Sequence, residues 1–250
     1  MPVSEINGHS HYYEDLGDGI PVVMLHGAAG SGAGFLAIAT ELSKEGFRVI
    51  VPDFRAMGRS EHVAEIPASA WVDDLLSLLD ELGIDKAVIH GVSLGSRVAL
   101  RFALDNPNRT LGCILDAAIV ANDPAGNAQL NRGFAPESMP QERKDTALRQ
   151  HGDNWAVVLQ NFFNIRNEPS LQEFYNLRGE AKNCTVPVLI IRGDNVPDPV
   201  HPLDHSIELL KSIPGAQLAI YPNGQSQITI ANPEIFKDLL RKFTSELTEK

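Results

Sequence analysis

The sequence predicts an α/β fold in which helices flank both faces of a mostly parallel central sheet. Short apolar segments of strand type alternate along the chain with segments whose apolar residues recur at helical spacing. The strand-type segments are apolar throughout, as in strands that are buried on both faces of a parallel sheet. The chain has 250 residues, and α/β folds of that length commonly form one domain.

Each expected strand is a short, largely apolar run. The first of them contains His11, Tyr12 and Tyr13 and is expected to be an edge strand or a hairpin. In chain order, the expected strands cover residues 8–16, 21–25, 47–51, 87–89, 111–115, 186–191 and 217–221.

The expected helices carry apolar residues three and four positions apart, so that one face of each helix is apolar. The clearest example contains Val72, Leu75 and Leu79, and Ser69 is its expected N-cap. Prolines open the last two helices, as is common at the first helical position. In chain order, the expected helices cover residues 35–42, 72–82, 94–102, 203–213 and 233–243.

Residues 121–180 lose the alternation of strands and helices. They contain large aromatic side chains, more than a flexible linker would carry. The segment is therefore expected to be a helical lid, and residues 1–120 and 181–250 are expected to form the core. Trp155, Phe162 and Phe163 are the candidates in this lid for binding an apolar part of a small-molecule substrate.

The composition excludes several classes of partner. A net charge of −11 would repel a phosphate backbone, so nucleic acid is not expected as a partner. No 18-residue apolar stretch and no signal peptide are present, so no membrane association is expected. Cys113 and Cys184 are expected to be buried thiols of a cytoplasmic protein. Neither a metal nor a cofactor is expected, and the oligomeric state stays open.

A short glycine-rich turn links the strand at 87–89 to the helix that follows it. Gly91, Ser93 and Gly95 spell G-x-S-x-G between these two elements. This pattern is the nucleophile elbow, in which a tight turn exposes a serine hydroxyl at the start of a helix. The free N–H groups of that helix end favour negative charge at the same place. Ser93 is thus the candidate nucleophile.

Four separate motifs resemble the α/β-hydrolase fold superfamily over nearly the whole chain. They are H-G after an early strand, D-F-R-x-x-G-R-S, the elbow, and G-D-N-x-x-D-P-V-H-P. The resemblance implies an oxyanion hole formed by the backbone N–H groups of Ala28 and Leu94. It also implies that His26 is a structural residue of its turn.

The resemblance further implies that the triad acid follows the strand at 186–191. Asp198 fits the end of the family motif and is favoured over Asp194, with Asp116 a distant third. His201 and His205 lie within and beside this motif. Both are expected to be structural or surface residues.

The histidine that serves as base in the family is missing from its usual place. It commonly stands seven residues before the proline that opens the last helix, and Ser226 occupies that position before Pro233. A shift by one residue puts Gln225 there, which cannot accept a proton either. No histidine occurs after His205. A serine hydroxyl without a neighbouring base is a poor nucleophile.

Several explanations stay open. Ser226 could be an engineered replacement, or a different group such as His90 or a lid residue could serve as base. Alternatively, the protein could be a non-catalytic binding member of the fold, or a cofactor-free lyase or oxygenase. The sequence favours a serine hydrolase-like protein that acts on a small, largely apolar ester or lactone. Arg55 and Arg59, expected near the mouth of the site, are either solvated or in reach of a substrate carboxylate.

Overall fold

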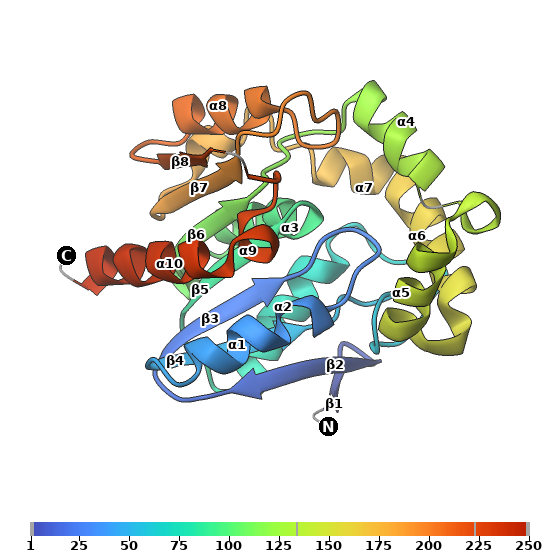
Figure 1. Ribbon diagram of the computed structural model, residues 1–250. Coiled ribbons are helices and arrows are strands. Elements are labelled where there is room, and N and C mark those ends of the chain that lie inside the picture. Colours follow the sequence, from blue (N-terminus) through green and yellow to red (C-terminus); the bar gives the residue numbers. More distant parts are fainter. Residues whose placement is uncertain (1–2, 134, 223, 249–250) are drawn as a thin grey trace.

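An eight-stranded sheet forms the centre of the molecule, with strand order β1-β2-β4-β3-β5-β6-β7-β8 (Figure 1). The computed structural model describes residues 3–133, 135–222 and 224–248. The first two strands pair antiparallel with each other, and β2 pairs antiparallel with β4; the remaining pairs are parallel. The predicted mostly parallel sheet is therefore confirmed, and the predicted first strand is a hairpin at its edge.

Each strand of the sheet agrees within a few residues with an expected run, apart from β1, which was not predicted. The strands are β1 Val3–Ile6, β2 His9–Leu16, β3 Ile20–Leu25, β4 Phe47–Pro52, β5 Ala87–Val92, β6 Thr110–Asp116, β7 Val188–Gly193 and β8 Gln217–Tyr221.

Helices cover both faces of the sheet, because each helix buries one apolar stripe against it. On one face, α1 and α10 pack through Ile38 and Phe236 onto strand residues such as Val88. On the other face, α2, α3 and α8 bury residues such as Leu79 and Val98 in a second cluster. Figure 1 shows α1 and α10 side by side in front of the sheet.

The α-helices agree in order with those expected, apart from the short helix α9, which was not predicted. They are α1 Leu36–Leu42, α2 Ala70–Glu81, α3 Leu94–Asp105, α4 Pro124–Gly133, α5 Gln141–His151, α6 Trp155–Asn167, α7 Pro169–Phe174, α8 Leu203–Ser212, α9 Ile228–Ala231 and α10 Pro233–Thr248. Short 3₁₀ helices occur at Gly32–Phe35, Pro107–Arg109, Pro136–Ser138, Gly152–Asn154 and Ala181–Asn183.

Ser69 stands at the predicted N-cap position of α2 but does not cap the helix backbone. Its hydroxyl donates to Asp73 Oδ2 at 2.7 Å instead. The backbone of Ser69 is already helical, with φ −82° and ψ −6°, so its side chain does not reach the N–H groups of the first turn in the way an extended N-cap does.

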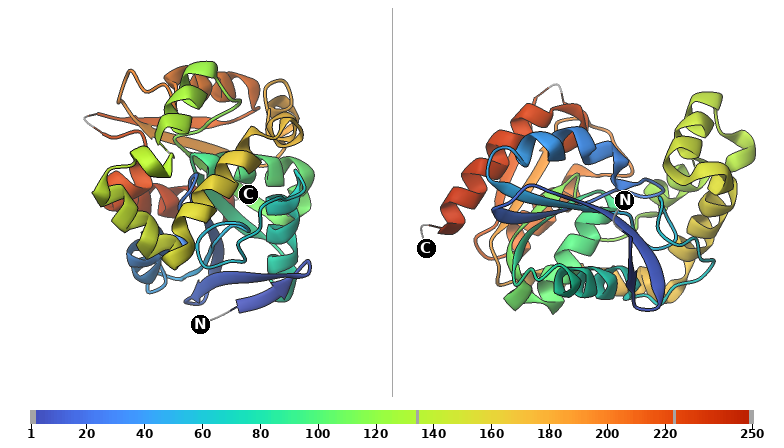
Figure 2. Two further views of the ribbon diagram at one scale, coloured as in Figure 1. Left: turned by 90° about the vertical axis from the view of Figure 1, so that its right-hand side faces the viewer. Right: turned by 90° about the horizontal axis from the view of Figure 1, so that it is seen from below.

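The segment between β6 and β7 contains the helices α4 to α7 and three of the 3₁₀ turns, and no strand occurs in the part of it that the structure describes. Figure 2 shows this green to yellow segment at one end of the sheet. Its helices pack on the rest of the molecule through buried residues that include Leu159 and Phe162.

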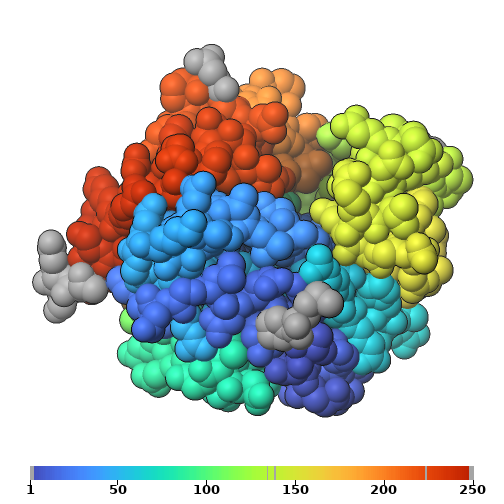
Figure 3. All heavy atoms as spheres, turned by 60° about the horizontal axis from the view of Figure 1, so that its bottom comes forward, coloured from blue at the N-terminus to red at the C-terminus, as the bar shows by residue number. Residues whose placement is uncertain are grey.

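Polar contacts tie this segment to the loops beside it. His151, at the end of α5, accepts a hydrogen bond from the Gly58 N–H at 2.9 Å, and its other ring nitrogen bonds the Ala29 carbonyl at 3.2 Å. The side-chain amide of Asn161 contacts the Val63 carbonyl at 3.4 Å. The surface view in Figure 3 shows the yellow segment against the cyan surface of the loop between β4 and α2.

In the described part of the chain, no helix combines the length and the apolar composition that crossing a membrane requires.

Candidate active site

Ser93 occupies a sharp turn between β5 and α3, as the elbow motif predicts. Its φ of 55° and ψ of −112° are unusual for a residue with a side chain. The backbone N–H of Ser93 donates to the Asp116 carbonyl at 2.9 Å, which ties the turn to the neighbouring strand. The strained conformation is held by this bond and by the packing around it.

The two glycines of the motif are required because backbone atoms occupy the space that a side chain would need. A Cβ at Gly91 would lie 2.0 Å from the Gly95 carbonyl oxygen, and a Cβ at Gly95 would lie 2.3 Å from the Leu25 carbonyl oxygen. These distances are far below van der Waals contact. The turn therefore brings α3 directly against β3.

His26 forms part of the turn that faces the elbow. Its Nδ1 donates to the Gly27 carbonyl at 2.8 Å, and its Nε2 accepts from the Phe54 N–H at 3.0 Å. Burial lowers the pKa of His26 to about 4, so the ring is neutral. This arrangement fits the structural role expected for His26. Ala28, two residues later, lines one cavity together with Ser93 and Leu94.

A hydrogen-bonded row of three side chains runs from Ser93 to Asp198. Ser93 Oγ lies 2.8 Å from His201 Nε2, and His201 Nδ1 lies 3.0 Å from Asp198 Oδ2. His201 is 8% exposed and Ser93 6%. The expectation of a surface position for His201 is therefore wrong, because its ring is buried and bridges Ser93 and Asp198.

Asp198 accepts four hydrogen bonds. The backbone N–H groups of Val200 and His201 donate to Oδ1 at 3.0 and 3.1 Å, while His201 Nδ1 and the Ser226 hydroxyl contact Oδ2. Burial alone would raise the pKa of Asp198, but the hydrogen bonds from His201 and Ser226 outweigh it and hold the pKa well below its usual range. Asp198 is thus a carboxylate at neutral pH.

Ser226 occupies the position at which the family commonly has its histidine, and it contacts Asp198. Ser226 is 5% exposed, and its hydroxyl reaches Asp198 from the loop before α9. Gln225 is exposed. Counting back from Pro233 located this loop correctly, but it could not show that His201 reaches the same space from the loop after β7.

The two alternative acids have other partners. Asp194 accepts a hydrogen bond from the Gly224 N–H at 3.2 Å and is exposed. Asp116 is fully buried and accepts bonds from the Ile228 and Thr229 N–H groups at 3.0 and 2.7 Å, at the start of α9. Burial raises the pKa of Asp116 to about 6. Neither carboxylate bonds a histidine among the described residues.

His90 and His205, the other histidines considered, contact residues other than Ser93. His90 Nε2 lies 2.9 Å from the Thr229 hydroxyl, and the His90 ring packs against Phe35 and Phe236. Burial lowers the pKa of His90 to about 3. His205 pairs with Asp123 at 2.9 Å, where α8 meets the start of the helical segment. His90 is thus not positioned to act as base for Ser93.

A cavity of about 40 Å³ lies beside Ser93. Of the three aromatic residues expected to bind substrate, only Phe162 lines it. Phe163 lines a separate groove, and Trp155 packs on the core cluster. The reason is helical geometry, since α6 turns Val158, Phe162 and Ile165 inward.

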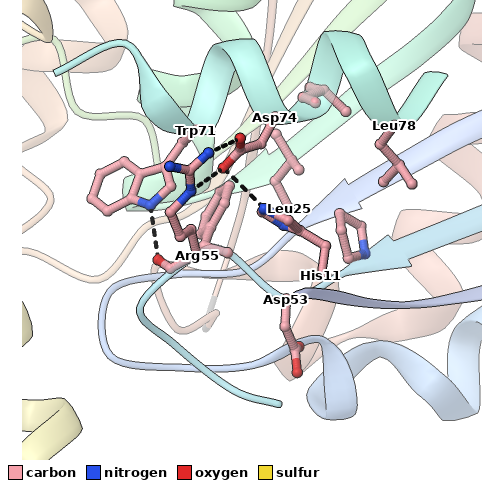
Figure 4. A pocket seen from close by; sticks show the side chains of 10 residues that line it. His11, Leu25, Asp53, Arg55, Trp71, Asp74 and Leu78 are labelled. Carbon is pink, nitrogen blue, oxygen red and sulfur yellow. Dashed lines mark hydrogen bonds and ion pairs between the residues drawn. The ribbon is translucent and has the colours of Figure 1, made fainter. Parts of the chain in front are cut away.

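Arg55 does not lie at the mouth of this cavity. Figure 4 shows its guanidinium paired with the Asp74 carboxylate in a separate buried pocket, beside Trp71 and His11. Arg59 stacks over the Tyr12 ring at 4.7 Å on the edge of the sheet. The suggestion that these two arginines reach a substrate carboxylate is therefore not supported by their positions.

Comparison with known proteins gives one family match. The sequence model described as alpha/beta hydrolase fold matches residues 20–176. A 2-hydroxymuconate semialdehyde hydrolase of Pseudomonas putida is 27% identical, over 96% of this chain and 92% of its own length.

Solved structures with similar folds cover nearly the whole chain. An N-acyl homoserine lactone degrading enzyme has a TM-score of 0.80 and 24% identity, covering 97% of this chain and 100% of its own. The enol-lactonase from Burkholderia xenovorans LB400 has a TM-score of 0.72 and 21% identity, covering 98% of this chain and 100% of its own. At these identities the likeness concerns the fold.

The elbow predicts a difference between two glycine substitutions. Gly95→Ala should lower the free energy of unfolding by about 1–3 kcal/mol or more, because its methyl group meets the Leu25 carbonyl. Gly34→Ala is the matched control, since nothing lies within 4 Å of a Cβ there, and should change stability little. Urea unfolding followed by circular dichroism measures both. Equal stabilities would contradict the close approach of α3 and β3.

The buried neutral histidines predict acid sensitivity. The pKa of His90 is lowered to about 3 by burial, so the unfolded chain binds a proton below about pH 6.5 that the folded chain does not. Stability should therefore be complete above about pH 6.5 and fall as the pH drops, by up to about 1.4 kcal/mol per unit for this group. His90→Gln should reduce that slope in urea unfolding. An unchanged slope would contradict a neutral buried His90.

Proposed function

The chain belongs to the α/β hydrolase fold family, and we propose that it hydrolyses an ester or lactone with Ser93 as nucleophile, His201 as base and Asp198 as acid. The observation that carries the proposal is the contact of Ser93 Oγ with His201 Nε2 at 2.8 Å. This distance is in the range that a general base needs to accept the serine proton.

The charge on Asp198 determines which nitrogen of His201 carries a proton. A carboxylate can only accept hydrogen bonds, so His201 Nδ1 is the protonated nitrogen and donates to Asp198 at 3.0 Å. Nε2 of the neutral ring is then a free acceptor that faces Ser93 Oγ. The tautomer is the one in which the ring can take a proton from Ser93.

In the first step, Ser93 Oγ attacks the carbonyl carbon of the substrate while its proton passes to His201 Nε2. Negative charge develops on the carbonyl oxygen, and the N–H groups of Ala28 and Leu94 are proposed to stabilise it. Both residues line the cavity with Ser93, and Leu94 begins α3, where N–H groups have no partner within the helix. The bond to the leaving oxygen then breaks, and His201 returns the proton to that oxygen.

The second step hydrolyses the acyl-serine. Water gives a proton to His201 Nε2 as its oxygen attacks the acyl carbon, the bond to Ser93 breaks, and His201 reprotonates Ser93 Oγ. In both steps the Asp198 carboxylate stabilises the positive charge on the His201 ring. Its contacts with the Val200 and His201 N–H groups keep it in place without taking the His201 proton.

The walls of the cavity support a small substrate with an apolar portion. Residues of the helical segment contribute Leu130, Phe162 and Leu171, and the core contributes Trp71 and Ile119. Residues 121–180 are therefore proposed to act as a lid over Ser93. The lactone-degrading enzyme and the enol-lactonase among the structural neighbours are compatible with this class of substrate.

Removal of the proposed base should abolish turnover. His201→Asn should lower kcat for 4-nitrophenyl butyrate by about 10⁴-fold or more, and Ser93→Ala should do the same, because the two side chains act as a unit. His90→Gln is the matched control: it also removes a buried histidine, but one that bonds Thr229, and it should keep most of the activity.

Labelling of Ser93 by an organophosphonate probe gives a second readout. The wild type should be labelled rapidly and His201→Asn far more slowly. If His201→Asn keeps the wild-type kcat, or if His90→Gln loses activity while remaining folded, the assignment of the base is wrong. If the folded wild type neither hydrolyses the ester nor reacts with the probe, the chain is not a serine hydrolase.

A further inference from the structure

Two arginines line the cavity beside Ser93, and both are buried. Arg97 lies on α3 and is 6% exposed; Arg166 lies on α6 and is 7% exposed. One comes from the core and the other from the helical segment. Buried arginines beside a cavity are uncommon, because removing a guanidinium from water is costly unless a partner compensates it.

The hydrogen-bond partners of both arginines are neutral. Arg97 donates through Nε and Nη2 to the Tyr175 carbonyl, and through Nη1 to the Asn122 side-chain oxygen at 2.7 Å. Arg166 donates to the side-chain oxygens of Asn127, at 2.8 Å, and Asn131. Amide oxygens satisfy these N–H groups but do not neutralise the charge.

Carboxylates act on other buried arginines of this chain. Asp74 forms a direct ion pair with Arg55. Arg192, which also donates to carbonyl oxygens, is acted on electrostatically by Asp198 and two further carboxylates. In the described part of the chain, no carboxylate forms an ion pair with Arg97 or Arg166. The Tyr175 ring lies 5.8 Å from the Arg97 guanidinium, but a ring carries no net charge. The cavity wall therefore holds two positive charges that no described carboxylate neutralises.

Both arginines remain charged at neutral pH. Burial lowers the pKa of Arg97 to about 10, and the neighbouring charge of Arg166 contributes to this shift. Burial also lowers the pKa of Arg166. The two cations repel each other. An anion between them would reduce both this repulsion and the cost of removing the two charges from water. Acidic residues that could pair with these arginines are plentiful, since the chain has a net charge of −11.

Both guanidiniums have N–H groups left for a ligand. A guanidinium carries five N–H groups, and the bonds to Asn127 and Asn131 use two of those of Arg166. The bonds of Arg97 use its Nε and one N–H from each terminal nitrogen. The remaining groups match the two oxygens of a carboxylate.

We infer that Arg97 and Arg166 bind a carboxylate on the acyl part of the substrate, so that the preferred substrate is a half-ester of a short dicarboxylic acid or a lactone that bears a carboxylate. The inference rests on the proposed role of Ser93. Arg97 follows Ser93 by one turn of α3, so the bound carboxylate lies only a few carbon atoms from the reacting carbonyl.

A matched pair of substrates tests this inference. Monomethyl succinate and methyl butyrate differ by a carboxylate in place of a methyl group, and methanol release measures both. The wild type should have a kcat/KM at least about tenfold higher for monomethyl succinate. Arg166→Gln should lower that value about 10- to 100-fold and change the value for methyl butyrate less than about threefold.

Arg101→Gln is the control variant, since Arg101 lies one turn further along α3 and pairs with Asp105 and Glu180 on the surface. It should leave both values unchanged. A wild type that hydrolyses methyl butyrate equally well or better would overturn the carboxylate subsite and leave the proposed hydrolysis intact.

Succinate binding separates the inference from catalysis. Titration of the Ser93→Ala variant with succinate, followed by the intrinsic fluorescence of Trp71 and Trp155 and by calorimetry, requires no turnover. Saturable binding that Arg166→Gln or Arg97→Gln weakens at least tenfold in this background supports the subsite, even if no ester is hydrolysed. Absence of saturable succinate binding to folded Ser93→Ala contradicts it.

Discussion

The hydrogen bonds that converge on the Asp198 carboxylate are the interaction on which the rest of the site depends. Two backbone N–H groups of its own loop, the His201 ring and the Ser226 hydroxyl all contact it. Together they keep the group ionised although it is largely withdrawn from water. The charge in turn selects the His201 tautomer, and that tautomer leaves Nε2 free for Ser93. Removal of the Asp198 charge would therefore affect both the His201 tautomer and the contact of Nε2 with Ser93.

The site joins two parts of the chain that are built in different ways. The elbow is held rigidly, because backbone atoms fill the space around Gly91 and Gly95 and the neighbouring strand binds the Ser93 N–H. The opposite wall comes from helices between β6 and β7, whose side chains reach the cavity. Arg97 belongs to the rigid part and Arg166 to the helical wall. A carboxylate bound between them would therefore also attract the two walls to each other.

Much of the fold could be predicted because its signals are local. Apolar runs, helical spacing and the G-x-S-x-G turn each depend on residues within a short stretch, and β5, α3 and the elbow follow from them. The place of His201 could not be predicted in this way, because it depends on how the loop after β7 folds back over the sheet. The only local signal was that His201 stands three residues after Asp198. The direction of Phe162 and Phe163, and the pairing of Arg55 with Asp74, likewise depend on tertiary packing.

The most direct test of the account is the protonation of the His201 ring in the resting protein. Nitrogen-15 labelling of histidine, with two-bond nitrogen–proton correlation spectra assigned by comparison with His201→Asn, identifies the nitrogen that carries the proton. The contacts of His201 with Asp198 and Ser93 predict a proton on Nδ1 and none on Nε2. A proton on Nε2 with an unprotonated Nδ1 would contradict the account, since the ring could then neither donate to Asp198 nor accept the proton of Ser93.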